Sequence, residues 1–337
     1  MSGPLLAVED LRVCFPTDEG ESRPVDGVSL EIRPGEALGL VGESGCGKSL
    51  TALSILGLVP SPPSRTLPGS SVRLRGEELL GAHPSRLRAV RGAEIAMIFQ
   101  EPMTSLNPVQ RVGDQIAEAI SVHRRVKRGA LRIEVLSLLE RVGMSDPERA
   151  RRAYPHELSG GMQQRAMISM AVACGPALLI ADEPTTALDV TIQAQILELL
   201  ASLQRDFDMA LLFISHDMAV VSQVADRVAV MYAGQVVEEA ATSDLFLRPA
   251  HPYTEGLLRA VPSIEATTES LAVIPGRVPH PTRWPDACRF HPRCPYQWDR
   301  CAQERPPLLK AGSARARCWL AEDPEHRAGV GFERVSK

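Results

Sequence analysis

Between residues 42 and 49 the sequence contains the run Gly42-Glu43-Ser44-Gly45-Cys46-Gly47-Lys48-Ser49. The run fits G-x-x-x-x-G-K-[ST], the pattern of a phosphate-binding loop, and it follows an apolar run at 37–41 that predicts a buried strand. The glycines let the backbone turn tightly, so that its N–H groups face phosphate oxygens at the start of a helix. We therefore expect Lys48 to reach the β- and γ-phosphates of a nucleotide and Ser49 to ligate Mg²⁺. The alternative is a glycine-rich turn without a ligand.

A second motif ends in two acids. Residues 178–183 are four apolar side chains followed by Asp182 and Glu183, which predicts a central strand with carboxylates at its end. Asp182 would hold the water shell of Mg²⁺ near Ser49, and Glu183 would orient or deprotonate an attacking water. The alternative is an ordinary acidic loop, and the phosphate-binding loop favours the functional interpretation.

A third motif lies about twenty residues before the second. Ser159-Gly160-Gly161 would begin a helix that runs to about Cys174, with serine as a good N-cap. Two glycines leave the backbone N–H groups bare, which makes a second anion site. A capped helix with no ligand is the alternative.

Strand and helix patterns alternate through the first 240 residues, which predicts an α/β fold. The expected strands are 5–15, 28–32, 37–41, 95–99, 177–181, 210–215 and 227–232. The expected helices are 49–58, 191–204 and 218–224. From 112 to about 153 apolar residues recur at three- and four-residue spacing, which indicates an inserted helical subdomain. After about residue 243 proline becomes dense, so long elements are not expected there.

Composition limits the class of protein. The chain of 337 residues has 37 Lys and Arg against 41 Asp and Glu, a formal charge of −4, which argues against coating nucleic acid through net charge. The most apolar stretch, 166–181, is interrupted and too short to span a bilayer, and the N-terminus has no pattern of a secretory signal. We expect a cytosolic protein, in which clustered cysteines more often bind metal than form disulfides.

Four of the seven cysteines and all three tryptophans lie after residue 280. The cysteines are Cys288, Cys294, Cys301 and Cys318, with the spacing C-x5-C-x6-C-x16-C. Four thiolates can hold Zn²⁺ or a [4Fe–4S] cluster, His291 could replace one of them, and a segment without metal stays open. A metal would staple a proline-rich segment that we expect to bury little core.

In their order the motifs resemble those of the ATP-binding subunits of ABC transporters, over roughly residues 5–260. The resemblance implies an α/β P-loop NTPase core with an antiparallel β subdomain and a helical subdomain at about 103–175. It also implies domains at 1–260 and 261–337, the second a small irregular extension with the four cysteines. Residues 42–49 resemble Walker A, 158–162 the signature and 178–183 Walker B, with Glu183 as the catalytic glutamate.

The resemblance also implies further roles. Gln100 resembles the Q-loop glutamine, Asp189 in 187–189 belongs to the D-loop, His216 resembles the switch histidine, and Phe15 would stack on adenine. The catalytic set is Glu183, His216 and Gln100. The implied Mg²⁺ ligands are Ser49, Gln100 and Asp182. The implied ATP contacts are Phe15, Gly42, Glu43, Ser44, Gly45, Cys46, Gly47, Lys48, Ser49, Leu50, Gln100 and His216. The signature residues that would reach the ATP of a partner subunit are Ser159, Gly160, Gly161, Met162 and Gln163.

Three further segments resemble the ATPase subunits of oligopeptide and dipeptide importers and their nickel relatives. They are 101–108, the run from His251-Pro252-Tyr253-Thr254 to 262, and the cysteine segment from 288 to 318. This resemblance implies peptide import driven by ATP and Mg²⁺, and it favours a [4Fe–4S] cluster over zinc. The implied partners are a second ATPase subunit, a paralogue in a heterodimer, two permeases and an extracytoplasmic peptide-binding protein, with no nucleic acid. The implied location is the cytoplasmic face of a bacterial cell membrane.

Other interpretations stay open. The same ATPase could serve nickel or another solute. The basic, aromatic C-terminal segment would suit an ABC ATPase that acts on nucleic acid, and a catalytically dead regulatory module is a third class. Cys46 lies at a helix N-terminus, where the pKa of a thiol tends to fall. A redox role for Cys46 is therefore one interpretation, and a small side chain that only fills space is the other.

Overall fold

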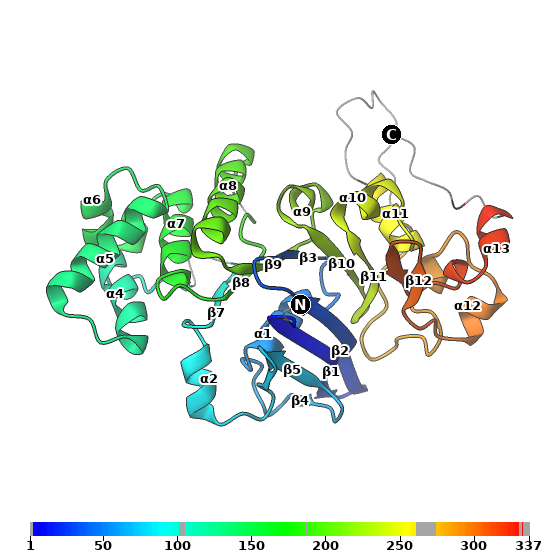
Figure 1. Ribbon diagram of the computed structural model, residues 1–337. Helices are drawn as coiled ribbons and strands as arrows, with labels where there is room; N and C mark the ends of the chain where they lie inside the picture. Colours follow the sequence, from blue (N-terminus) through cyan, green and yellow to red (C-terminus); the bar gives the residue numbers. More distant parts are fainter. Residues whose placement is uncertain (1–2, 101–104, 187, 261–273, 330–331, 333–337) are drawn as a thin grey trace. The chain divides into compact units, whose positions relative to one another are not determined.

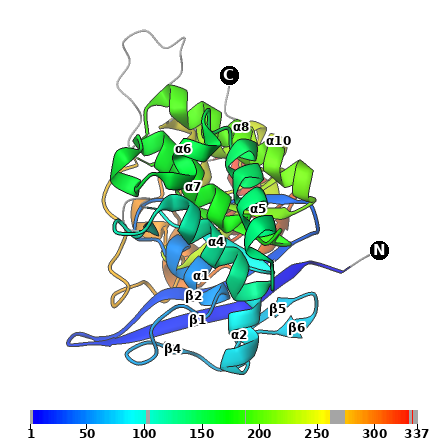
Figure 2. The same cartoon turned by 90° about the vertical axis from the view of Figure 1, so that its left-hand side faces the viewer.

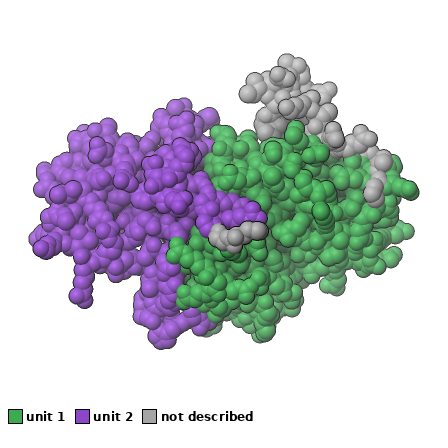
Figure 3. All heavy atoms as spheres, viewed as in Figure 1, with its two compact units in different colours: residues 1–31, 37–80, 215–337 green, residues 32–36, 81–214 purple. Residues whose placement is uncertain are grey.

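The computed structural model describes residues 3–100, 105–186, 188–260, 274–329 and 332 (Figure 1). The chain divides into two compact units, which Figure 3 colours separately. Unit 1 comprises 1–31, 37–80 and 215–337, and unit 2 comprises 32–36 and 81–214. The expected domain boundary after residue 260 adjoins 261–273, which lie outside the described residues, as do 101–104 at the expected start of the helical subdomain.

Unit 1 contains an antiparallel sheet in the order β2-β1-β5-β6, with β4 paired to β1. Its strands are β1 (Leu6–Thr17), β2 (Gly20–Ile32), β4 (Arg65–Thr66), β5 (Ser71–Leu74) and β6 (Glu77–Glu78). Figure 2 shows β1 and β2 as a long hairpin. Both strands are longer than the apolar alternation predicts. Most of residues 16–24 at the hairpin tip are exposed, so this part of the strands has no alternation of buried and exposed residues to detect.

A second sheet of unit 1 carries the phosphate-binding segment. Strand β3 (Ala37–Val41) runs parallel to β10 (Arg227–Tyr232), and β11 (Gln235–Ala241) is antiparallel to β10. Helices α1 (Lys48–Ile55), α9 (Met218–Val224), α10 (Thr242–Leu247) and α11 (Pro252–Arg259) belong to the same unit. The strands expected at 37–41 and 227–232 and the helix expected at 218–224 are confirmed, whereas β11 has no counterpart in the sequence-based prediction.

The C-terminal segment extends this second sheet. Strand β13 (Ala314–Ala316) pairs with β11, and β12 (Leu309–Ala311) pairs with β13. The other elements are short, among them α12 (Asp299–Gln303) and α13 (Pro324–Gly329), as the prolines predict. The expectation of little core is wrong, since Phe290, Trp319 and Leu320 are buried. Phe290 packs on Tyr232 and Tyr253, so the segment buries its apolar side chains against the rest of unit 1.

Unit 2 contains three parallel strands and most of the long helices. The strands β7 (Ile95–Ile98), β8 (Leu178–Asp182) and β9 (Ala210–Ser215) pair in that order. Figure 2 shows the inserted helices together, and they are α4 (Val112–His123), α5 (Arg128–Arg141), α6 (Pro147–Arg152) and α7 (Gly160–Ala171). Helices α2 (Pro84–Val90) and α8 (Val190–Phe207) complete the unit. Among the described residues, no helix is both long and apolar enough to cross a bilayer.

Candidate functional site

The phosphate-binding loop lies in unit 1 between β3 and α1. Gly47 is the N-cap of α1 with φ 106°, and Gly45 has φ 79°; both lie in the left-handed region that favours glycine. A Cβ at Gly47 would lie 2.3 Å from the carbonyl oxygen of Pro24, and one at Gly42 would lie 2.1 Å from that of Met231. The surrounding backbone therefore leaves no room for a side chain at either position.

Lys48 folds back over this loop. Its side chain is buried, and Nζ donates to the carbonyl oxygens of Gly42 at 2.7 Å and Glu43 at 3.1 Å. The ammonium group is thus held by the same backbone that the sequence predicts to cradle phosphates.

The pKa of the Cys46 thiol shifts in the direction opposite to the one expected from the sequence. The residue is fully buried, and burial raises the pKa of its thiol, although the neighbouring Lys48 lowers it. The expected fall of the pKa at the helix N-terminus is therefore wrong, because loss of water around the thiolate outweighs the local positive charge. A buried, protonated thiol is a packing residue and gives no support to a redox role.

In unit 2 two predicted residues meet at the ends of adjacent strands. Gln100 follows β7 and Glu183 follows β8, and Nε2 of Gln100 donates to Oε2 of Glu183 at 3.2 Å. Thr186 donates to the same carboxylate oxygen at 2.9 Å. Asp182, the last residue of β8, is buried. A carboxylate held by an amide and a hydroxyl in this way has a fixed orientation, as a group that positions water requires.

The third motif begins α7 as the sequence predicts. Ser159 is the N-cap, and its Oγ accepts from the backbone N–H of Met162 at 3.4 Å. Gly160 is exposed, and a Cβ there would meet no described residue within 4 Å apart from its chain neighbours and the backbone of its own helix, whereas a Cβ at Gly161 would approach Ile192 at 3.1 Å. Gln163 turns inward and donates to the carbonyl oxygen of Pro155 at 2.9 Å. Its amide thus braces the loop before the helix.

Gln164 is a buried polar residue beside the predicted site, and the sequence motifs do not include it. It is almost fully buried, and its Nε2 donates to the carbonyl oxygen of Pro184 at 2.6 Å. This bond ties α7 to the residue that follows Glu183. The sequence feature that could have identified it is an amide side chain two residues before the apolar run Ala166, Met167 and Ile168 in the same helix.

The remaining predicted residues are distributed over both units. Asp189 caps α8 by accepting from the N–H of Ile192 at 2.9 Å, and Ala187 before it lies outside the described residues. His216 is exposed directly after β9, and Phe15 is half-buried on β1. Unit 1 holds Phe15, residues 42–50 and His216, and unit 2 holds Gln100, residues 159–163, Asp182, Glu183 and Asp189.

Comparison with known proteins decides the family. The family profile "ABC transporter" matches residues 25–186, and "Oligopeptide/dipeptide transporter, C-terminal region" matches 237–301. The oligopeptide transport ATP-binding protein AppD of Bacillus subtilis is 50% identical over 320 residues, which cover 95% of this chain and 97% of that protein. The chain belongs to the ATP-binding subunits of oligopeptide and dipeptide ABC transporters.

Two further similarities agree with this assignment. The dipeptide transport ATP-binding protein DppD of Escherichia coli is 49% identical over 324 residues, 96% of this chain and 98% of that protein. A solved dimeric bacterial ABC transporter cassette matches with a TM-score of 0.62 at 25% identity, covering 70% of this chain and 98% of the cassette. This ATP-binding subunit therefore has the ABC ATPase fold and is an ATPase coupled to transport.

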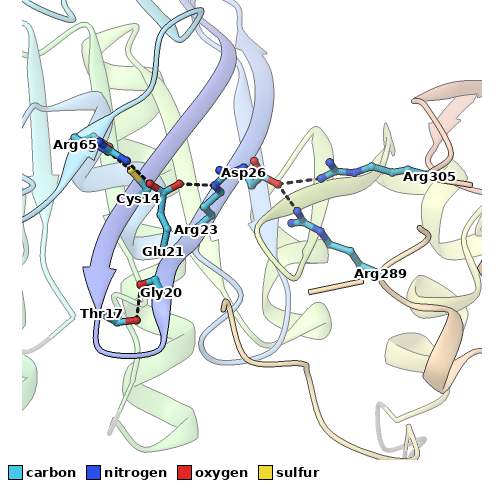
Figure 4. A network of polar contacts seen from close by, with 9 residues as sticks. All are labelled: Cys14, Thr17, Gly20, Glu21, Arg23, Asp26, Arg65, Arg289 and Arg305. Carbon is cyan, nitrogen blue, oxygen red and sulfur yellow. Dashed lines mark hydrogen bonds and ion pairs between the residues drawn. The ribbon is translucent and has the colours of Figure 1, made fainter. Parts of the chain in front are cut away.

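The C-terminal segment of this ATP-binding subunit is joined to the body of unit 1 by three ion pairs, of which Arg289–Asp26 is buried on both sides. Asp26 on β2 is paired with Arg289 and with Arg305, the latter at 3.1 Å (Figure 4). Burial raises the pKa of Asp26, and the two arginines lower it further than burial raises it, so the carboxyl stays ionised. Arg293 pairs with Glu43 of the phosphate-binding loop at 2.7 Å.

The four late cysteines lie near one another. Burial raises the pKa of Cys288 to about 11 and that of Cys294 to about 12, and charge on the neighbouring cysteines raises both. Burial likewise raises the pKa of Cys318, with contributions from the other three. Yet across residues 3–100, 105–186, 188–260, 274–329 and 332, no group of three or more His, Cys, Asp and Glu side chains is arranged to hold a metal ion. The arrangement of these described side chains thus does not support the expected ligand set.

Proposed function

We propose that this ATP-binding subunit powers the import of di- and oligopeptides by binding and hydrolysing ATP. The observation that carries the proposal is the hydrogen-bonded pair of Gln100 and Glu183 at the ends of β7 and β8, in a chain that also has an intact phosphate-binding loop. Relatives named for oligopeptide and dipeptide transport match it along nearly its whole length, which supports peptides as the cargo.

The proposed division of labour follows from the residue types. Lys48 would bind the β- and γ-phosphates, and Phe15 would stack on the adenine. Ser49, Gln100 and Asp182 would hold Mg²⁺, which supplies charge neutralisation on the phosphate oxygens. Glu183 would orient or deprotonate the attacking water, and His216 would contact the γ-phosphate. Positioning and charge stabilisation thus account for most of the catalysis.

The signature implies a partner. Ser159, Gly160 and Gly161 would reach the nucleotide of a second ATPase subunit, so that two ATP molecules are sandwiched head to tail. We propose a paralogue as that subunit, together with two permeases and an extracytoplasmic peptide-binding protein. ATP binding would close the pair and hydrolysis would reopen it, at the cytoplasmic face of the membrane.

A transport assay tests the proposal. The importer, assembled with this subunit, is reconstituted in vesicles and supplied with ATP, the binding protein and labelled di- or oligopeptides. We expect ATP-dependent peptide uptake that is lost when this subunit carries Glu183→Gln. Uptake of Ni²⁺ or a sugar in place of peptides would assign the same engine to another solute and overturn the peptide substrate.

The basic and aromatic composition of the C-terminal segment suggests binding to nucleic acid, but the structure gives this function less support. The tryptophans that would stack on bases are engaged within the chain: Arg289 lies 3.9 Å from the ring centroid of Trp284, and Arg300 lies 3.5 Å from that of Trp319. Trp298 stacks on His326 with ring centroids 4.0 Å apart. Retention of the purified subunit on DNA or RNA at physiological salt would reverse this preference.

A metal at Cys288, Cys294, Cys301 and Cys318 is a separate proposal. The number of cysteines in this short segment supports it, and a [4Fe–4S] cluster is proposed ahead of Zn²⁺, although the described side chains are not arranged as a ligand set. No step of the proposed reaction passes through the metal. Protein purified without oxygen is expected to be brown and to contain iron and acid-labile sulfide. Protein that contains zinc but no iron would support Zn²⁺ in place of the cluster. Colourless protein without iron or zinc would exclude both metals.

A further inference from the structure

Glu43, the second residue of the phosphate-binding loop, is held from two sides by residues of the C-terminal part of the chain. Its backbone N–H donates to the hydroxyl oxygen of Tyr253 at 2.9 Å. Its carboxylate accepts two hydrogen bonds from Arg293, from Nη1 at 2.7 Å and from Nη2 at 3.0 Å. Such a two-point guanidinium–carboxylate contact fixes direction as well as distance.

Arg293 is itself anchored before it reaches the loop. Its Nε donates to the carbonyl oxygen of Pro275 at 2.8 Å, and Nη2 also contacts that of Ile274 at 3.4 Å. The guanidinium carbon lies 5.7 Å from the ring centroid of Tyr232. The side chain is 4% exposed, while that of Glu43 is 31% exposed. An arginine with this many fixed contacts loses little entropy when it binds the carboxylate.

Tyr253 is equally fixed. It is fully buried, and its ring centroid lies 4.7 Å from that of Tyr232 and 5.4 Å from that of Phe290. Phe290 lies in the cysteine-bearing segment, three residues before Arg293. The aromatic packing therefore sets the position of the hydroxyl group that accepts from Glu43.

The two contacts bear on the lysine of the loop. The carbonyl oxygen of Glu43 accepts from Nζ of Lys48 at 3.1 Å, so a displacement of Glu43 displaces the partner of the ammonium group. We propose that Arg293 and Tyr253 are positioning residues that hold Glu43, and through it the phosphate-binding loop, in the shape that accepts the phosphates of ATP. The cysteine-bearing segment thereby sets the affinity for nucleotide. This inference rests on the proposed function, namely that the loop binds ATP.

The expected effect is on binding more than on the chemical step. Without Arg293 or the Tyr253 hydroxyl, the loop spends part of the time in conformations that do not bind ATP. The apparent Kd for ATP then equals the intrinsic Kd divided by the fraction of molecules in the binding-competent conformation. We expect Arg293→Met to raise the Kd for MgATP about tenfold and Tyr253→Phe to raise it roughly threefold, with kcat changed less than about twofold. Arg293→Lys keeps the charge and should recover part of the affinity.

The test measures the Kd of a fluorescent ATP analogue with Mg²⁺ on the full chain, and KM and kcat for ATP. The variants are Arg293→Met, Arg293→Lys, Tyr253→Phe, Glu43→Gln and the double variant of Arg293→Met with Glu43→Gln. Arg305→Met is the matched control, because it removes an ion pair between the C-terminal segment and Asp26 without touching the loop. Thermal unfolding shows whether each variant is folded.

A positioning role predicts that the double variant binds no more weakly than Glu43→Gln alone, since Arg293 acts through Glu43. A merely structural role would lower the unfolding temperature in Arg305→Met and Arg293→Met alike and leave the Kd of both unchanged. Wild-type affinity in folded Arg293→Met and Tyr253→Phe, or fully additive losses in the double variant, overturns the inference while the proposed function stands. Absence of MgATP binding to the wild-type chain overturns both.

Discussion

At the scale of single residues, the backbone of Glu183 is unusual. Its φ is 47°, in the left-handed region that non-glycine residues rarely adopt. Its N–H donates to the carbonyl oxygen of Ile214 at 2.9 Å, and Gln100 and Thr186 hold the carboxylate. Such a conformation costs roughly 1–3 kcal/mol and persists where the surroundings over-determine it, commonly at functional sites.

Replacing the carboxylate tests the assigned role. Glu183→Gln keeps the size of the side chain but removes the base, so we expect ATP binding to stay intact and hydrolysis to fall by about 10²–10⁴-fold. Single-turnover hydrolysis and nucleotide titration measure the two effects. Glu198→Gln, an exposed carboxylate on α8, is the control with normal activity. Wild-type turnover in Glu183→Gln would remove Glu183 from the mechanism.

The glycines of the loop give a graded test. Gly45 and Gly47 both have positive φ, but only a Cβ at Gly47 would strike backbone, since a Cβ at Gly45 would meet no described residue within 4 Å apart from its two chain neighbours. We expect Gly45→Ala to cost about 1 kcal/mol of stability and to keep some ATP binding. Gly47→Ala should abolish binding and cost more, because the backbone itself must move. Denaturation and nucleotide titration of both variants check this order, and equal effects would contradict it.

At the scale of elements, the junction between β11 and α11 is buried and carries two titratable groups. Glu238 on β11 accepts the backbone N–H groups of Ala250 at 2.7 Å and His251 at 2.9 Å. His251 caps α11 by accepting from the N–H of Tyr253 at 3.0 Å. Burial raises the pKa of Glu238 to about 7 and lowers that of His251 to about 3. The same loss of water thus acts in opposite directions on an acid and a base.

The two shifts oppose each other as the pH changes. The raised pKa of Glu238 contributes stability that is present below about 4.5 and is lost as the pH rises through about 7. The lowered pKa of His251 contributes stability that is present above about 6.5 and is lost as the pH falls toward about 3. Between pH 4.5 and 6.5 the two slopes cancel.

Replacing His251 should leave the effect of Glu238 on the pH dependence of stability unopposed. Asparagine is a good N-cap, so His251→Asn keeps the cap of α11 while removing the titration. We expect the free energy of unfolding of this variant to rise by about 2 kcal/mol from pH 7 to pH 5, relative to the wild-type change. Urea denaturation at the two pH values measures it. The same pH response in both proteins would show that His251 does not stay neutral on folding.

At the scale of the molecule, the C-terminal segment is part of the body of unit 1. It adds β13 to the edge of β11, and Arg289 and Arg305 neutralise the buried Asp26 (Figure 4). Arg289 lies over the ring of Trp284, which in turn closely approaches Gly234. The segment thus supplies hydrogen bonds, charge and apolar contacts that β10 and β11 lack without it.

Deleting 274–337 should therefore destabilise the ATPase body. The deletion removes both arginine partners of Asp26 and exposes the edge of β11, which invites aggregation. We expect most of the truncated protein to be insoluble, and Arg289→Met in the full chain to cost on the order of 3 kcal/mol. Solubility and thermal unfolding measure both. A truncated protein that is soluble and as stable as the full chain would show that the body folds independently.

The nucleotide motifs could be predicted from the sequence because each is contiguous. The phosphate-binding loop, its flanking strand and helix, the N-cap at Ser159 and the acids at the end of β8 depend on residues within a few positions of each other. The spacing of such residues carries the conformation, since turns, caps and strand alternation are local. The pairing of Gln100 with Glu183 follows in part, because adjacent parallel strands bring their ends together.

The contacts of the C-terminal segment become visible only in the folded chain. Arg293 meets Glu43 across 250 positions of sequence, and Arg289 meets Asp26 across 263. An arginine and a carboxylate so far apart have no local pattern that distinguishes them from solvated charges. The high pKa of the Cys46 thiol was equally invisible, because burial depends on what packs around a residue. Local residue order therefore specifies the nucleotide-binding motifs, whereas long-range packing specifies which residues of the C-terminal segment contact them.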